Sequence, residues 1–329
     1  MPNKPTKHHY VPQFYLRGFY DSTDRLHVYD RLKQRYSKPL TSKSIAFEAG
    51  YYFIENDSSK ESADIEYLLG TFETKAQPVI AKLIQGIDIT RDERIAMAAF
   101  VALQSQRVPH VEKRLRESSH KAGLALMKES AKRGYFSSLI KGKYSNGSTP
   151  FPNPEEIDAY MIKAIDEGRI TQTLPKNNVI RFMLEAAAKL EVGYFNNDWI
   201  IVEAPSGSAF ITSDNPVANI GKGFLGPDSI RVFPINKNVS LVIGNSGTPT
   251  QYRRRASKRE VKGINDAIAE RSDRYIIGSN EQLLRSVVNR TKTITTSNEP
   301  RAEVSVFQNP DNPNSTFFRL DHTGPDSRG

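Results

Sequence analysis

The pattern of apolar and polar residues divides the chain into three regions. Residues 1–55 are rich in aromatic and β-branched residues separated by polar turns, which predicts short strands at "RLHVYD" (25–30) and "GYYFIE" (50–55). Residues 61–197 have apolar positions at helical spacing. Residues 198–290 return to strand-like runs and end in helical ones.

The helical region contains several predicted helices. From Ile65 to Leu83 the apolar residues keep one face, and Pro78 is expected to kink or divide this helix. A helix over 91–108 is apolar nearly all round, which is typical of a buried helix. The pattern also predicts helices at 111–132, 155–167 and 177–192, and a loop rich in Gly, Ser, Pro and Asn at 141–156.

The last region predicts antiparallel strands followed by helices. "DWIIVE" and "AFITS" surround "APSGS" and predict a hairpin, and "RVFPINKNVSLVIG" adds one or two strands. Ser257 and Glu260 have the spacing of a capping box at a helix start, and "NEQLLRSVVNR" is a short helix. We expect an α+β fold with one integrated core, a single domain over 1–290, and a loosely attached polar tail at 291–329 with one strand at 304–307.

Composition excludes several classes of protein. The 329-residue chain is 38% apolar and has no cysteine, so it has no disulfides and no thiolate metal sites. No apolar run has the length of a membrane span, and no secretory signal is recognisable, so we expect a cytoplasmic protein without membrane contact. The formal net charge of +9 favours a polyanionic partner, and nucleic acid is possible.

Polar residues within apolar helix faces are the first candidates for a site. Gln104 and Arg107 share one face of the apolar helix, and a buried arginine must be paired. Arg107 is therefore either in a structural salt bridge or in an anion clamp. Glu66 and Glu73 flank the apolar stripe of the preceding helix; they are either exposed, or Glu73 pairs with Arg107 or binds a metal.

Two later residues are also candidates. Asp214, in "FITSDNPV", directly follows a predicted strand, where a carboxylate can be held firmly and still be reached. The same Asp-Asn-Pro occurs in a plain loop at 309–314, so the preceding strand is what distinguishes Asp214. Asn265 falls on the apolar face of its helix and either caps a neighbouring backbone group or belongs to a site.

"HHYVPQFYLRGF" (8–19) is the densest segment. His8 and His9 could serve as a general base or as metal ligands, although adjacent side chains point in different directions, so one of them is expected to face a site. The apolar residues around them predict that the segment is packed as a latch. No Walker, Rossmann, HExxH, nucleophile-elbow or zinc-ribbon pattern is present, and "YRRRASKREVK" (252–262) is either a solvated helix start or a phosphate-contacting edge.

These segments, in order, resemble the domain-of-unknown-function family 4238. The opening motif, the glutamates of the next helix, "FVALQSQRVP", "FITSDNPV", "FPINKNVSLVI" and "INDAIAERSDRYII" carry the resemblance, which covers about residues 7–280. It supplies no mechanism; a link to phage defence or another conflict system is an expectation. The resemblance points to these site residues: His8, His9, Gln13, Arg17, Glu66, Glu73, Gln104, Arg107, Asp214 and Asn265.

The leading hypothesis is a metal-dependent phosphodiester hydrolase, most plausibly a nuclease. Glu73, Asp214 and His9 would hold Mg²⁺ or Mn²⁺, or a histidine would act as base, and Arg107 would stabilise phosphate charge. Catalysis is assigned to His8, His9, Gln104, Arg107, Asp214 and Asn265, and nucleic-acid contact to Arg17, Arg253, Arg254, Arg255, Lys258 and Arg259. The alternatives are a non-catalytic nucleic-acid or ligand-binding module with a buried polar network, and a purely structural role. The sequence does not indicate the oligomeric state.

Overall fold

The computed structural model describes residues 7–52, 59–144, 153, 156–221, 229–291, 301–309 and 312–323. The chain divides into two compact units, the first within Met1–Glu112 and Lys176–Thr296 and the second within Lys113–Pro175 and Ser297–Gly329. A compact unit need not fold independently, so the domain expected over 1–290 and its tail stay a prediction. The fold is α+β, as predicted, with helices and mixed sheets.

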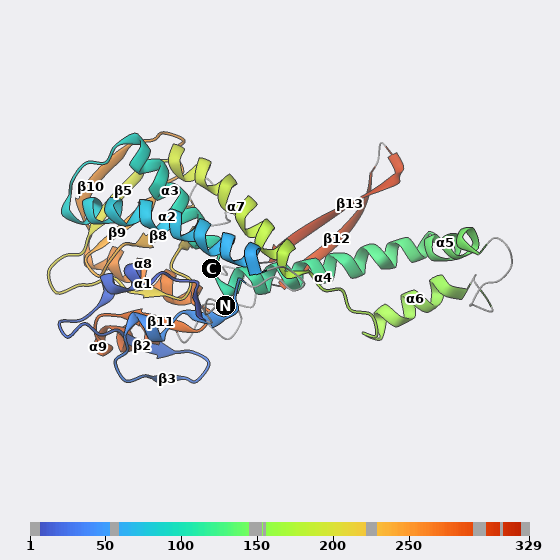
Figure 1. Ribbon diagram of the computed structural model, residues 1–329, viewed down its shortest axis with the longest axis horizontal. Coiled ribbons are helices and arrows are strands. Elements are labelled where there is room, and N and C mark those ends of the chain that lie inside the picture. The colour runs from blue at the N-terminus through green and yellow to red at the C-terminus, as the bar shows by residue number, and fades with distance from the viewer. Residues whose placement is uncertain are drawn as a thin grey trace. The chain divides into compact units, whose positions relative to one another are not determined.

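Three long helices pack together in the first unit (Figure 1): α2 (Ser59–Gln85), α3 (Arg91–Gln106) and α7 (Lys176–Asn196). Pro78 was expected to kink or divide this helix. It lies inside α2 and does not divide it. Thr90 and Glu93 form a capping box at the start of α3, a signal that the sequence analysis overlooked. The middle of α3, from Met97 to Gln104, is buried, as its apolar pattern predicts.

A five-stranded sheet lies against these helices, in the order β10-β5-β9-β8-β7. Its strands are β5 (Trp199–Glu203), β7 (Ala218–Ile220), β8 (Ile230–Pro234), β9 (Val239–Ile243) and β10 (Gln251–Arg255). β8 and β9 are the two strands in "RVFPINKNVSLVIG", where one or two were expected, and they pair antiparallel. β10 was not predicted; it pairs in parallel with β5 at the edge of the sheet.

A four-stranded antiparallel sheet has the order β3-β2-β11-β6. Its strands are β2 (His27–Asp30), β3 (Arg35–Tyr36), β6 (Thr212–Ser213) and β11 (Tyr275–Gly278). The hairpin expected from "DWIIVE" and "AFITS" is wrong, because β5 and β6 belong to different sheets. Asp214 follows β6 directly, as predicted. α8 (Lys258–Arg271) begins with the predicted Ser257–Glu260 capping box, and α9 (Glu281–Thr291) follows β11.

The five-stranded sheet has an apolar core on each face, because successive side chains alternate sides. Trp199, Ile201 and Leu241 pack with α2, α3 and α7. Val202 and Val242 on the same strands pack with α8, α9 and β11. No helix in the described part of the chain is both long and apolar enough to cross a lipid bilayer.

The N-terminal motif is packed into the first of these cores. β1 (Lys7–His9) pairs with β4 (Phe47–Ala49), and the short helices α1 (Gln13–Leu16) and η1 (Arg17–Phe19) follow; a third, η2, is Ser42–Ser44. The strand expected at 50–55 is wrong where it can be compared: β4 ends at Ala49, residues 50–52 form a turn, and 53–55 lie outside the described residues. The predicted latch is visible in Val11, Leu16 and Phe19, which have no exposed surface.

The second unit consists of helices and one strand pair. α4 (Pro109–Lys132) enters it from the first unit, and α5 (Tyr135–Lys143), which was not predicted, and α6 (Ile157–Asp166) follow. The strand expected at 304–307 lies within β12 (Arg301–Asn309), which pairs antiparallel with β13 (Asn312–Thr323). Much of the loop expected at 141–156 lies outside the described residues.

Tyr15 connects the N-terminal motif to both sheets, and its replacement tests the latch. Its buried hydroxyl lies 2.7 Å from Thr212 Oγ1 and donates to the Pro234 carbonyl at 2.8 Å. We expect Tyr15→Phe to lower the free energy of unfolding by about 1–3 kcal/mol, because two buried partners lose a hydrogen bond. Urea denaturation measures this, with the half-exposed Tyr252→Phe as control. Equal effects of the two substitutions would contradict the latch.

Candidate functional site

His8 joins the N-terminal motif to α2. Its Nδ1 accepts a hydrogen bond from the backbone N–H of Tyr52 at 3.0 Å, so in the neutral ring the proton lies on Nε2. Nε2 lies 3.1 Å from Glu66 Oε1. Both ring nitrogens of this buried side chain are therefore engaged, and His8 positions Tyr52 rather than facing a substrate.

Arg107 is the centre of a second chain of contacts. Its Nη1 donates to Glu73 Oε1 at 2.8 Å and its Nε to Gln104 Oε1 at 2.9 Å. Gln104 in turn donates to the Tyr10 carbonyl at 3.0 Å. The pairing with Glu73 is the structural salt bridge considered for Arg107, and it joins α2, α3 and the N-terminal motif.

Two buried hydrogen-bond donors in this region face each other. The Tyr52 hydroxyl lies against the Arg107 guanidinium, and Arg107 Nη2 and this hydroxyl have no further hydrogen-bond partner. The two groups lie near each other: burial raises the pKa of Tyr52 to about 12, and the Arg107 guanidinium partly opposes that increase. Buried polar atoms are nearly always hydrogen-bonded in folded proteins, and the donor capacity left on the Arg107 guanidinium suits water or an anionic group.

His9 points elsewhere than His8 and is half-buried. Its Nδ1 lies 3.5 Å from Gln13 Nε2, and the ring also lies against the backbone of Ser42 and Lys43. Burial lowers the pKa of His9, and hydrogen bonds with the backbone of Ser42 and Lys43, followed by the charge of Glu73, oppose that decrease. The ring is therefore neutral near pH 7 and can accept a proton. Of the two adjacent histidines, His8 is the fully buried one with a carboxylate partner, and His9 is the half-buried one.

Asp214 is buried in a different set of contacts. Its two carboxylate oxygens accept hydrogen bonds from the backbone N–H groups of Asp273 at 3.0 Å and Arg274 at 2.7 Å. Burial raises the pKa of Asp214 to about 7 against the lowering effect of the Arg274 N–H, and the charge of Asp273 adds to the increase. Asp214 thus holds the chain that leads into β11.

Tyr10 lies between the contacts of Arg107 and the contacts of Asp214, and the sequence analysis missed it. Its carbonyl accepts from Gln104, and its ring is 5.8 Å from that of Tyr51, centre to centre. Burial raises the pKa of the Tyr10 hydroxyl, and the charge of Asp214 contributes. The signal was present: Tyr10 follows the two histidines, and Tyr51 and Tyr52 form the only Tyr-Tyr pair of the chain.

His110 was also missed. It lies in the first turn of α4, three residues after Arg107, and its Nδ1 is 3.9 Å from Asp273 Oδ1. Its Nε2 is buried and makes no hydrogen bond. The sequence signal is its place directly after "FVALQSQRVP", the segment that supplies Gln104 and Arg107. His110 thus adds an imidazole near Asp273, the residue whose backbone N–H bonds Asp214.

Asn265 and the basic run lie outside these contacts. Asn265 accepts from the Ile211 N–H at 3.0 Å and donates to the Ala209 carbonyl at 2.9 Å, so it caps backbone groups, one of the two roles considered. In the basic run, Arg253 pairs with Glu203 and Arg254 with Glu260. Of the residues predicted to contact nucleic acid, Arg17, Arg255, Lys258 and Arg259 are exposed and form no ion pair with the residues that the structure describes.

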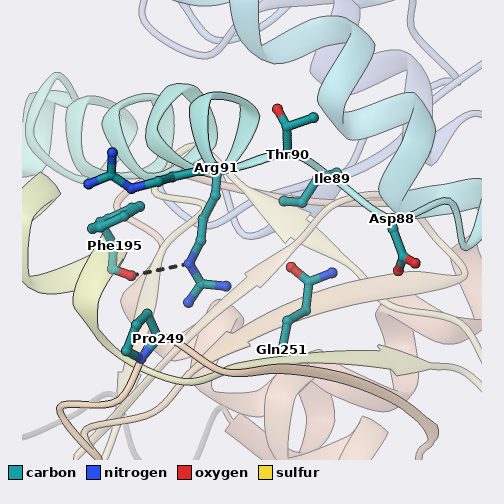
Figure 2. A pocket seen from close by; sticks show the side chains of 8 residues that line it. Asp88, Ile89, Thr90, Arg91, Phe195, Pro249 and Gln251 are labelled. Atoms are coloured by element: carbon teal, nitrogen blue, oxygen red, sulfur yellow. Dashed lines mark hydrogen bonds between the residues drawn. The ribbon is translucent and has the colours of Figure 1, made fainter.

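A hollow of about 400 Å³ lies beside the turn between α2 and α3 (Figure 2). Arg91 lies over the Phe195 ring there, and the Gln251 side chain borders the opening. Arg94, also in its lining, donates to the Phe195 carbonyl at 3.1 Å, and burial lowers the pKa of Arg94 to about 10. None of the predicted site residues lines this hollow.

The predicted metal ligands do not form a metal site. Among the residues that the structure describes, no three or more His, Asp or Glu side chains are grouped so that they could hold an ion. Glu73 is paired with Arg107, and Asp214 is held by two backbone N–H groups. Glu73, Asp214 and His9 therefore do not fit Mg²⁺ or Mn²⁺ as one ligand set.

Comparison with known proteins places the chain in a family. No curated protein sequence and no solved structure matches it significantly. A family model described as "Protein of unknown function (DUF4238)" matches residues 7–282, a range that includes every residue of the contacts described above. The chain therefore belongs to the DUF4238 family of proteins of unknown function.

Proposed function

We propose that the protein is a phosphodiester hydrolase that acts on nucleic acid, a nuclease. The observation that carries the proposal is the buried Arg107 guanidinium, which contacts the Tyr52 hydroxyl, has donor capacity left at Nη2 and pairs with Glu73, whose charge also acts on the neutral His9. Such donors suit a phosphate oxygen, and a neutral imidazole suits proton abstraction from the attacking group.

The remaining residues have supporting roles in this proposal. Glu73 and Gln104 orient Arg107, and His8 holds Tyr52 in place. The exposed cations, Arg17, Arg255, Lys258 and Arg259, are proposed to contact nucleic-acid phosphates and agree in sign with the net charge of +9. Because Glu73, Asp214 and His9 do not fit a metal as a set, no step is assigned to Mg²⁺ or Mn²⁺. A role in phage defence stays a prediction from the family resemblance.

The second candidate is a binding module without catalysis. The observation that favours it is that His8, Gln104, Asp214 and Asn265 have their polar atoms engaged by neighbouring groups, as in a structural network. In that case Arg107 and the exposed basic side chains would hold phosphates and nothing would be cleaved.

A cleavage assay with two histidine variants separates the candidates. Purified protein is incubated with labelled single- and double-stranded DNA and RNA, with Mg²⁺, with Mn²⁺ and with EDTA. We expect His9→Gln to reduce cleavage by about 10²–10⁴-fold, the typical contribution of a general base, and to keep binding. His8→Gln, whose side chain is structural, is expected to lower the melting temperature.

The result decides between the two functions. Binding without cleavage of any substrate by the wild type supports the binding module and overturns the nuclease. Cleavage that His9→Gln leaves unchanged overturns the role of His9. A lower melting temperature in both variants, with no effect on cleavage or binding, would show that both histidines serve only to hold the latch.

A further inference from the structure

We infer that the hollow beside the turn between α2 and α3 is a binding site for a nucleoside monophosphate, whose phosphate is held by Arg91 and Arg94. Two arginines, an aromatic ring and an amide line this one open cavity of about 400 Å³ (Figure 2). None of the residues proposed for cleavage lines it. The site is therefore independent of the proposed nuclease function.

Arg94 is a buried cation without a carboxylate partner. The residue is 7% exposed, and it forms no ion pair within the described part of the chain. Its Nε donates to the Phe195 carbonyl at 3.1 Å and its Nη2 to the Asn197 carbonyl at 2.5 Å. These carbonyls do not neutralise the charge, and Asp198, whose charge acts on Arg94, forms no ion pair with it. A buried charge is usually paired, so an anion from outside the chain would complete this contact.

The third nitrogen of the Arg94 guanidinium is available to a ligand. Nη1 makes no hydrogen bond with a described residue, and it is not among the fully buried atoms that lack one, so it keeps exposed surface in the hollow. The guanidinium carbon lies 4.1 Å from the centre of the buried Trp199 ring. This ring and the carbonyls fix the guanidinium before a ligand arrives, which lowers the entropic cost of binding.

Arg91 supplies a second cation to the same hollow. It precedes Arg94 by three residues, so both side chains leave the same face of α3. The Arg91 guanidinium lies over the Phe195 ring, 5.5 Å from its centre, and has no ion pair with a described residue. A phosphate monoester has a charge of about −1.5 to −2 at pH 7, which matches two guanidinium groups that each suit its oxygens. A carboxylate, with a single charge, would leave one cation uncompensated.

The rest of the hollow suits the nucleoside. Its volume of about 400 Å³ is in the range of small-molecule sites, about 300–1,000 Å³, and leaves room for more than a phosphate group. Ile89, Pro249 and the Phe195 ring form an apolar wall for a planar base. The Gln251 amide can donate to and accept from the edge of a base, and the Asp88 carboxylate can accept from ribose hydroxyls. Neither of these two side chains makes a hydrogen bond with a described residue.

Tryptophan fluorescence tests the site directly. Trp199 is the only tryptophan of the chain, and Arg94 lies over its ring, so its emission reports on an anion bound at Arg94. AMP, GMP, CMP and UMP are each titrated into the full-length protein. We expect at least one of them to change the emission in a saturable way and to raise the melting temperature. The matching nucleoside should cause no change at the same concentration, and inorganic phosphate should bind at least about tenfold more weakly.

Two matched variants assign the binding to the hollow. We expect Arg91→Met to weaken nucleotide binding by about ten- to hundredfold, the effect of losing one charge-assisted hydrogen bond. Because Arg91 is exposed, the melting temperature of the free protein should not change. The control is Arg181→Met: Arg181 is also an exposed arginine of a long helix, 5.3 Å from the centre of a phenylalanine ring, Phe182, but it lies outside the hollow. This variant should bind as the wild type does.

Arg94 itself is replaced by methionine as a third variant. Arg94→Met should abolish binding, but it also leaves backbone carbonyls without their donor and is expected to lower the melting temperature. The comparison of Arg91→Met with Arg181→Met therefore decides. No response to any of the nucleotides, or binding of the nucleoside or of inorganic phosphate as tight as that of the nucleotide, overturns the inference. Equal effects of Arg91→Met and Arg181→Met, or no effect of Arg91→Met, overturn it as well.

Discussion

Replacing Arg107 by methionine is expected to lower the free energy of unfolding by about 3–5 kcal/mol, the cost of removing one partner from a buried ion pair. The Arg107 side chain is 2% exposed, and it bonds Glu73 and Gln104 at 2.8 and 2.9 Å. Methionine fills similar space but leaves the Glu73 carboxylate without its cation. Cleavage should be lost as well, and urea denaturation gives the stability.

Two further variants isolate the ion pair. Arg17→Met removes an exposed arginine from the same N-terminal motif and should change stability by less than about 0.5 kcal/mol. The double variant Glu73→Met with Arg107→Met leaves no lone charge, so its loss should be smaller than the sum of the two single losses. Strictly additive losses would contradict direct coupling between Glu73 and Arg107.

Asp214 is expected to make stability fall as pH rises. Its pKa is about 7 in the folded protein, because of burial, and 3.8 is the ordinary value. Between these values the native state keeps a proton that the unfolded state has released, so the free energy of unfolding decreases with pH. At pH 8, a shift of this size in the pKa of Asp214 lowers the free energy of unfolding by about 4 kcal/mol, compared with a pH at which Asp214 is protonated in both states.

The comparison with Asp214→Asn isolates this carboxyl group. Asparagine does not titrate, and it turns an NH₂ group toward one of the two backbone N–H donors, so it lowers stability by an amount that does not change with pH. Urea denaturation from pH 4 to 8 should therefore show the advantage of the wild type shrinking as pH rises. A constant or growing advantage would mean that Asp214 is ionised in the folded protein throughout that range.

Local patterns were sufficient to predict most helices and one of the ion pairs. The apolar positions of α3 and the Ser257–Glu260 capping box of α8 are properties of neighbouring residues, so the sequence contains them directly. The pairing of Arg107 with Glu73 follows from a general rule, that a buried arginine needs a partner, together with an acidic residue near an apolar stripe.

Distant pairings account for what was missed. β10 has five exposed residues without apolar alternation and becomes a strand through its pairing with β5, about fifty residues earlier. β6 pairs with β11 rather than with β5, and this pairing depends on the other strands of the four-stranded sheet. Tyr10 and His110 were missed because their environments depend on Asp214 and Asp273, which the sequence places far from both.

The contacts of the N-terminal motif have a consequence for synthesis on the ribosome. Tyr15 contacts Thr212, 197 residues further on, and bonds the Pro234 carbonyl, 219 residues further on. At about 5–20 residues per second, the motif waits about 10–40 s for the first of these partners. During that time Val11, Leu16 and Phe19, buried in the finished protein, have no five-stranded sheet to pack against. The nascent chain should therefore be a substrate for chaperones that bind apolar segments, and become resistant to protease only near the end of translation.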